Sequence, residues 1–419
     1  PGPNRAVIDS RKVERGDLFI GLKGEHVDGG QFAQQAIDQG AWGVLTTPDK
    51  APTPNSQLPT PVITAEDPLS AMQSLARAWR RELGVKTIGI TGSTGKTSTK
   101  DILSALLRPH VRTHANHENL NNEIGLPLSV LEAQAGTEAL VLEMAMRGAG
   151  QIAELVAIAE PDVGVIVNIG PVHLELLGTI ERVAAAKAEL IRDLQPGATC
   201  VVPQAEELLA EHLRDDVETI TFGDGGDVQL AAFEDGVARI SARGRELELE
   251  VPYNEPYNLR NTLAAVAAAL AIGVEPSGRA DVRFSSLRGE LVELEGGVAV
   301  VNDCYNANPM SMRAALDSLA EAPAERRVAV LGWMAELGPD ADRFHREIGE
   351  HLAERGIDAL VPVGDAALLY AERFDGEVHP VATPEEAGAV LERIARPGDR
   401  VLIKGSRSAG LERVLGERR

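Results

Sequence analysis

The clearest chemistry lies in the stretch Val85–Lys100, which reads VKTIGITGSTGKTSTK. An apolar, β-branched run leads into a turn of small residues, and isoleucine and leucines at helical spacing follow, so the stretch predicts strand, loop and helix. Gly92 and Gly95 let the backbone fold tightly and direct N–H groups at phosphate oxygens, and the helix N-terminus adds a positive dipole end. Lys96 would reach the β- and γ-phosphates, and the Thr97 hydroxyl would bind Mg²⁺. The predicted nucleoside triphosphate site consists of Gly92, Ser93, Thr94, Gly95, Lys96 and Thr97.

This loop departs from the usual phosphate-binding pattern at one position. Ile90 stands five residues before Gly95, where that pattern has a glycine. The alternative, an ordinary glycine turn between a strand and a helix, is the less favoured interpretation because strand, loop, Lys-Thr and helix occur together.

Two more polar side chains follow apolar strands. Glu143 ends the run Leu140–Glu143, where phosphate-loop proteins have an oxygen ligand for Mg²⁺. His173 comes just after the run Val165–Ile169 and would face the same edge of the sheet. A solvated glutamate and a hydrogen-bonded loop histidine are the structural alternatives, and for His173 the residues leave both open.

Several other polar residues are ambiguous from pattern alone. Lys187 lies among alanines and reads as an ordinary solvated helix lysine. Asn258 and Asn261 open an alanine-rich helix, where asparagines usually act as caps. The turn Tyr305–Pro309 uses specific polar side chains rather than generic turn formers, whereas Asp9–Arg11 at a strand end fits either a phosphate or ribose contact or a plain turn.

Composition narrows the function classes. The chain has 419 residues, 44% of them apolar and 25% charged, as expected for about two to four globular domains. Its formal charge of −22 argues against nucleic-acid or anionic-membrane binding, so local groups must hold any anionic substrate. Two cysteines give no disulfide framework, and no apolar run approaches the ~20 residues of a membrane span. We therefore expect a cytoplasmic protein, with no signal peptide and no membrane insertion.

The order of the predicted elements indicates an α/β fold of three domains. Short strands and a helix fill residues 1–83, where a helix over Pro68–Leu83 ends at Gly84. Residues 84–284 alternate strands and helices, which predicts a mostly parallel sheet with an antiparallel excursion near residues 223–251. Residues 285–419 alternate again, and the pattern predicts a doubly wound domain that closes with a final helix.

The chain resembles the Mur ligases, the ATP-dependent enzymes that extend the peptidoglycan peptide. The match runs from about Asp9 to Arg413. The segments that carry it are Asp9–Arg11, Thr91–Thr97, Asn121–Pro127, Tyr305–Pro309 and Lys404–Ser408. The resemblance implies a UDP-binding first domain, a central ATPase and a Rossmann-like third domain. It also implies that ATP phosphorylates the carboxylate of UDP-MurNAc-tripeptide and that the amine of D-Ala-D-Ala attacks the acyl phosphate.

The same resemblance implies roles for individual residues. Thr97 and Glu143 match Mg²⁺ ligands, and His173 matches a ligand of a second metal. Lys187 matches a lysine that is carbamylated in the family, which replaces the solvated interpretation. The remaining assignments are Asn261 and Asp303 at adenine and ribose, Arg288 near the γ-phosphate, Ser10 and Arg11 at the UDP group, and Asn122 in the sugar-peptide channel.

Three departures from the family pattern put local substrate contacts in question. Trp333 stands where an acidic residue is expected, Gly30 stands where a histidine is expected, and the segment Thr113–Leu120 looks altered. The alternatives are a Mur ligase that adds the third amino acid, folylpolyglutamate synthetase, and a nucleotide-dependent switch without ligase activity. The first lacks support because no Asp-Asn-Pro-Arg type motif is present, and the second because residues 1–82 suggest a UDP domain. A monomer is expected.

Overall fold

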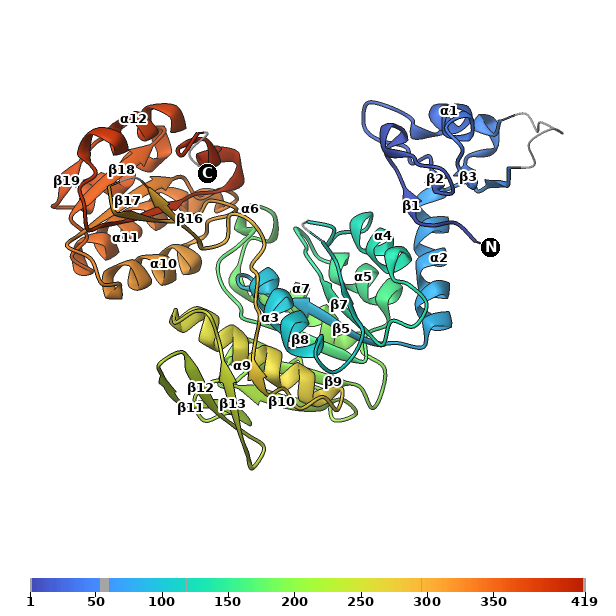
Figure 1. The fold of residues 1–419 in the computed structure, drawn as a ribbon, viewed down its shortest axis with the longest axis horizontal. Helices are drawn as coiled ribbons and strands as arrows, with labels where there is room; N and C mark the ends of the chain where they lie inside the picture. The colour runs from blue at the N-terminus through green and yellow to red at the C-terminus, as the bar shows by residue number, and fades with distance from the viewer. Residues whose placement is uncertain (1, 53–59, 118, 295, 417–419) are drawn as a thin grey trace.

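The computed structural model describes residues 2–52, 60–117, 119–294 and 296–416. It contains three sheets, each in its own lobe, and the lobes follow one another along the chain (Figure 1). The three-domain α/β architecture predicted from the sequence is therefore confirmed. Residues 53–59 of the proline-rich loop predicted in the first domain lie outside the described residues. No helix in the described ranges is both long and apolar enough to cross a membrane.

The first domain is a four-stranded parallel sheet in the order β1-β2-β3-β4. Its elements are β1 (Ala6–Val7), η1 (Ser10–Lys12), β2 (Leu18–Ile20), η2 (Gly29–Phe32), α1 (Ala33–Asp38), β3 (Gly43–Thr46), η3 (Pro48–Lys50) and β4 (Val62–Thr64). Helix α2 (Pro68–Leu83) then connects this sheet to the central domain (Figure 1). Gly84, at φ 60°, ends it, as the sequence predicted, and the Asp67 side chain caps its first turn.

The central domain contains a ten-stranded sheet in the order β14-β13-β12-β11-β10-β9-β8-β5-β7-β6. Strands β6 to β10 are parallel to their neighbours, and β11 to β13 form the predicted antiparallel excursion. The strands are β5 (Lys86–Thr91), β6 (Thr113–Ala115), β7 (Ala139–Glu143), β8 (Val163–Ile166), β9 (Thr199–Pro203), β10 (Glu218–Phe222), β11 (Val228–Glu234), β12 (Val237–Ala242), β13 (Arg245–Glu250) and β14 (Gly278–Arg279).

Helices cover both faces of this sheet. Helices α3 (Lys96–Leu107) and α9 (Pro256–Ala271) share one apolar core, in which the buried alanines of α9 let the two helices approach closely. The other face carries α4 (Gly125–Glu132), α5 (Gln151–Ala159), α6 (Leu174–Leu177), α7 (Ile180–Arg192) and α8 (Glu207–Ala210). Because β5, β7 and β8 are parallel neighbours, their carboxyl ends meet at one edge of the sheet.

The third domain is a six-stranded sheet in the order β15-β16-β20-β17-β18-β19, with β15 antiparallel to β16 and the other pairs parallel. Its strands are β15 (Glu290–Leu294), β16 (Val298–Asp303), β17 (Arg326–Gly332), β18 (Ala359–Val363), β19 (Glu377–Val378) and β20 (Asp399–Lys404). Its helices are α10 (Pro309–Glu321), η4 (Gly338–Asp340), α11 (Ala341–Glu354), η5 (Asp365–Arg373) and α12 (Pro384–Ile394).

The predicted final helix is wrong. Within the described residues, β20 is followed only by the short 3-10 turns η6 (Arg407–Ala409) and η7 (Leu411–Arg413). Gly410 lies between them at φ 66°, in the left-handed region, and interrupts any continuous helix.

Candidate active site

The predicted phosphate loop joins β5 to α3 at the edge where the parallel strands end. Gly95 adopts φ 75°, and a Cβ there would lie 2.7 Å from Asn261 Oδ1 on α9. Only glycine satisfies both the backbone conformation and this close approach. The predicted sequence of strand, loop and helix is present, and Asn261 packs directly against the loop.

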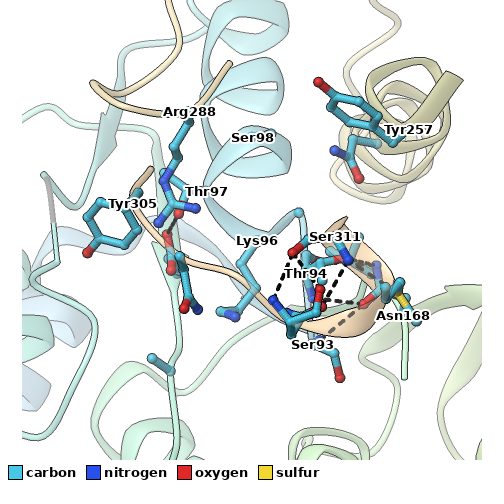
Figure 2. A pocket seen from close by; sticks show the side chains of 18 of the residues that line it. Ser93, Thr94, Lys96, Thr97, Ser98, Asn168, Tyr257, Arg288, Tyr305 and Ser311 are labelled. Atoms are coloured by element: carbon cyan, nitrogen blue, oxygen red, sulfur yellow. Dashed lines mark hydrogen bonds between the residues drawn. The ribbon is translucent and has the colours of Figure 1, made fainter. Parts of the chain in front are cut away.

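Asn168, just after β8, holds the loop in shape through four hydrogen bonds (Figure 2). Its Oδ1 accepts from Ser93 N at 3.1 Å and Thr94 N at 2.9 Å, and its Nδ2 donates to the Thr94 carbonyl and hydroxyl oxygens. The N–H groups of Ser93 and Thr94 are therefore already paired, which leaves the start of α3, from Gly95 to Thr97, to present N–H groups to a phosphate. Sequence reasoning did not single out Asn168, although it lies in the run that led to His173.

Two lysines donate to the same carbonyl oxygen. Lys96 Nζ lies 2.8 Å and Lys187 Nζ 3.0 Å from Gly92 O. Burial lowers the pKa of the Lys96 ammonium, with Glu143 opposing and Arg288 adding to this effect. Burial, reinforced by the nearby Lys96, lowers the pKa of Lys187 far more.

The solvated interpretation of Lys187 is therefore wrong, because the residue is 1% exposed. A signal for this was present in the sequence. Lys187 is four residues from Val183 and from Ile191, so it shares the buried face of α7.

Thr97 and Glu143 form the oxygen pair that the sequence predicted. Thr97 Oγ1 donates to Glu143 Oε2 at 2.6 Å, and Asn121 Nδ2 donates to Oε1 at 2.8 Å. The Asn116 side chain fixes the Glu143 backbone: its Oδ1 accepts from Glu143 N, and its Nδ2 donates to Glu143 O. A hydroxyl and a carboxylate that converge at the loop fit Mg²⁺, which prefers a few protein oxygens together with phosphate oxygens.

His173, the predicted ligand of a second metal, is paired within the protein. Among the described residues, no three His, Cys, Asp or Glu side chains come together as metal ligands. His173 Nδ1 instead pairs with Glu336 of the third domain, and Arg147 Nε lies 3.5 Å from the same carboxylate. Burial lowers the pKa of His173, and Glu336 opposes the shift. Sequence reasoning missed Glu336, which is 163 residues away.

Two of the three family departures, Trp333 and Gly30, fit tightly into their local surroundings. Trp333 packs in the core of the third domain, where its ring lies 3.2 Å from the Cβ position of Gly364. A Cβ on Gly30 would lie 2.6 Å from Thr46 Oγ1 and 3.0 Å from the Lys50 side chain, which leaves no room for a histidine.

A cavity of about 930 Å³ between the central and third domains contains most of the candidate residues. Its lining includes Ser93, Thr94, Gly95, Lys96, Thr97, Asn122, Glu143, His173, Asn261, Arg288 and Asp303. In it, Arg288 lies 4.0 Å from the Tyr305 ring centroid, and Lys404 Nζ donates to Asp303 Oδ2 at 2.5 Å (Figure 2 shows Arg288 beside Tyr305). Asn122 Oδ1 also accepts from Gly125 N at 2.8 Å at the start of α4.

Four predicted residues are not part of the cavity lining. Gly92 and Lys187 lie behind the loop, connected to it by the hydrogen bonds described above. Ser10 and Arg11 belong to the first domain, and the Arg11 side chain, 84% exposed, pairs with Asp9. The structure therefore assembles the nucleotide side of the predicted site and leaves its UDP side apart.

Comparison with known proteins identifies relatives of all three domains. Family models match residues 6–80 ("Mur ligase family, catalytic domain"), 90–269 ("Mur ligase middle domain") and 287–407 ("Mur ligase, glutamate ligase domain"). The UDP-N-acetylmuramoyl-tripeptide–D-alanyl-D-alanine ligase of Bacillus subtilis is 36% identical, over 97% of this chain and 91% of the relative. Its counterpart in Synechocystis is also 36% identical, over 99% and 91%.

Solved structures agree with these relatives. The MurF ligase from Thermotoga maritima in complex with ADP superposes with a TM-score of 0.86 at 32% identity, over 98% of this chain and 96% of that one. MurF from Acinetobacter baumannii gives a TM-score of 0.87 at 29% identity, over 99% and 92%.

Proposed function

The chain belongs to the Mur ligase family, and we propose that it joins D-Ala-D-Ala to UDP-MurNAc-tripeptide in an ATP-dependent reaction. The observation that carries this proposal is the likeness, over nearly the whole chain, to two ligases named for that reaction. A ligase that adds the third amino acid is not favoured, since the structure named for that activity is only 18% identical.

The reaction begins with two anions that must meet. The tripeptide carboxylate attacks the γ-phosphate of ATP, giving an acyl phosphate and ADP, and the amine of D-Ala-D-Ala then attacks the acyl carbon and releases phosphate. Lys96 and Arg288 line the cavity and supply positive charge where negative charge accumulates. Holding the three reactants together replaces a rare encounter with a positioned one.

Thr97 and Glu143 are the residues that would hold Mg²⁺, which supplies charge neutralisation to the β- and γ-phosphates. Their role is supported by the 2.6 Å contact between their oxygens. His173 is proposed for a second metal, which requires it to leave Glu336. Lys187 is proposed as a carbamate: a neutral amine is the form that reacts with CO₂, and burial favours that form here.

The remaining assignments concern substrate binding. Asn261, which packs on Gly95, is proposed at the adenine, and Asp303 at the ribose. Ser10 and Arg11 are proposed to bind the UDP group, and Asn122 to line the channel for the sugar and peptide. These roles assume domain boundaries after residues 83 and 284, a monomer, and a reaction in the cytoplasm, where ATP is available.

Phosphate release tests the proposal directly. The protein is incubated with ATP, Mg²⁺ and UDP-MurNAc-tripeptide, with D-Ala-D-Ala or single amino acids as acceptor. We expect release only with the dipeptide, together with a UDP-pentapeptide product. Release with a single amino acid on UDP-MurNAc-dipeptide would assign the chain to the preceding ligation. No release with either pair would favour a nucleotide-binding protein without ligase activity.

A further inference from the structure

Arg288 is a cation without a carboxylate partner among the residues that the structure describes. It lies in the cavity lining, between β14 and β15, and within the described part of the chain it forms no ion pair. Its contact is with the face of the Tyr305 ring, 4.0 Å from guanidinium carbon to ring centroid. In a chain of net charge −22, a neutral partner leaves the full charge of this arginine available.

The backbone fixes the two side chains relative to each other. Tyr305 N donates to Leu287 O at 3.2 Å, so the residue next to Arg288 is tied to the turn that carries Tyr305. Leu287 adopts φ 63°, an uncommon conformation for leucine, and its side chain is buried in the third-domain core. The backbone hydrogen bond and the buried Leu287 therefore hold the Tyr305 ring and the Arg288 guanidinium next to each other.

The chemistry of the pair points to a ligand with several oxygens. A guanidinium stacked on a ring keeps its N–H donors at its edges, where they match a phosphate in a bidentate manner. Arg288 and Lys96 line the same cavity. The Tyr305 hydroxyl has no hydrogen-bond partner among the described residues, so the ring face is the part of the side chain in use.

From this geometry we infer that Tyr305 is a positioning residue for Arg288: its ring holds the guanidinium in the cavity, charged and unpaired, to receive the γ-phosphate of ATP. The inference rests on the proposed function, since it needs a reaction in which that phosphate is transferred. The inference gives the Tyr305 ring a role of its own, beyond its place in the turn Tyr305–Pro309.

The test compares wild type with Tyr305→Phe, Tyr305→Leu, Arg288→Ala and the double variant, by steady-state kinetics and by ADP titration. Tyr305→Leu should lower kcat/KM for ATP roughly 3- to 30-fold, as expected for loss of one cation–π contact. Tyr305→Phe, which keeps the ring, should stay within about twofold of wild type. The Kd for ADP should hardly change, since ADP lacks the γ-phosphate.

The double variant separates positioning from general structure. If Tyr305 acts through Arg288, Tyr305→Leu adds no further loss to Arg288→Ala. The inference is overturned if the two losses multiply, if Tyr305→Phe is as impaired as Tyr305→Leu, or if ADP affinity falls in parallel with activity. Should Tyr305→Leu not fold, as judged by its melting curve, Tyr305→Met replaces it in the same cycle. An inactive wild type would instead contradict the proposed function.

Discussion

The phosphate loop and the turn at Ser10 and Arg11 are both proposed to bind substrate, yet the structure treats them differently. The loop between β5 and α3 and the first residues of α3 line one cavity with their polar groups. The Arg11 side chain is exposed and forms an ion pair with Asp9, two residues away. The groups of the loop are positioned within the central domain, by the loop itself and by Asn168, whereas Ser10 and Arg11 lie in another domain from the cavity.

Distance in the fold makes the same distinction. The loop is fixed by strands that run side by side with β5, whereas the first domain is joined to the rest through α2 and through α4, whose Leu128 packs into the first-domain core (Figure 1). If Ser10 and Arg11 bind the UDP group as proposed, substrate binding has to bring that side of the site to the nucleotide side, as in other enzymes that close over their substrates. The predictions below test how independent the two sides are, from the largest expected effect to the smallest.

Replacing Lys96 by methionine should have the largest effect. The Lys96 ammonium is one of the two cations that contact the transferred phosphate in the proposed reaction, and loss of such a group costs roughly 10³-fold in kcat. The melting temperature should hold or rise, because the desolvation that lowers the Lys96 pKa opposes its charged form. Phosphate release and calorimetry measure the two effects. Lys86→Met, at an exposed position of β5, is the control, and retention of activity within tenfold by Lys96→Met would contradict the role.

Lys187→Ala should abolish most activity, and a short carboxylic acid such as acetate should restore part of it. The smaller side chain leaves space in which a carboxylate can stand where the carbamate is proposed. Lys187→Met fills that space, so it should be inactive without rescue. Because the Lys187 pKa is lowered, wild type should retain the neutral amine as the pH falls below the usual lysine range, and lose activity once the pH passes below the lowered pKa. Full activity of Lys187→Ala would exclude the carbamate.

Asn168→Leu should weaken nucleotide binding more than turnover. The variant leaves the N–H group of Thr94 without its acceptor, whereas Ser93 N keeps its hydrogen bond to the Asn168 carbonyl, and the loop loses the side chain that fixes its shape. We expect the Kd for ADP to rise roughly tenfold, measured by titration calorimetry, together with a lower melting temperature from the unsatisfied donor. An unchanged Kd would show that the loop keeps its shape through its own residues alone.

The elements near the loop could be predicted from the sequence because their signals are local. The glycines, the apolar strand and the spacing of α3 all lie within one short stretch, and Glu143 ends a strand whose pairing follows from the parallel pattern. Asn168 and Glu336 could not be predicted in this way. Each acts on a side chain or loop 74 or more residues away, through hydrogen bonds that no periodicity encodes.

The third domain shows a second limit. Strands β16, β17, β18 and β20 follow apolar runs and were predicted, but β15 and β19 were not. Both are edge strands with exposed residues, and only their pairing with β16 and β18 defines them. The final helix failed for the opposite reason: a helical pattern was present, and Gly410 interrupted it.

Arg11→Ala is the smallest perturbation and tests the UDP side alone. The guanidinium of Arg11 lowers the pKa of Asp9 to about 2, so its removal should return that pKa toward 3.8. In wild type, whatever small stability the pair adds is present above pH 3.8 and disappears as the pH falls through about 2, whereas in the variant it is absent throughout. Carboxyl NMR titration of Asp9 measures the shift, with Arg11→Lys as the conservative control.

The same titration shows whether Arg11 turns to substrate. If the arginine leaves Asp9 for the diphosphate of UDP-MurNAc-tripeptide, the Asp9 pKa in wild type should rise when that substrate is added. The KM for this substrate should then be a few-fold higher in Arg11→Ala, with the KM for ATP unchanged, because exposed ion pairs contribute little and the nucleotide side is assembled without the first domain. If the Asp9 pKa stays at about 2 with substrate bound, Arg11 is still paired with Asp9 and does not bind the UDP group.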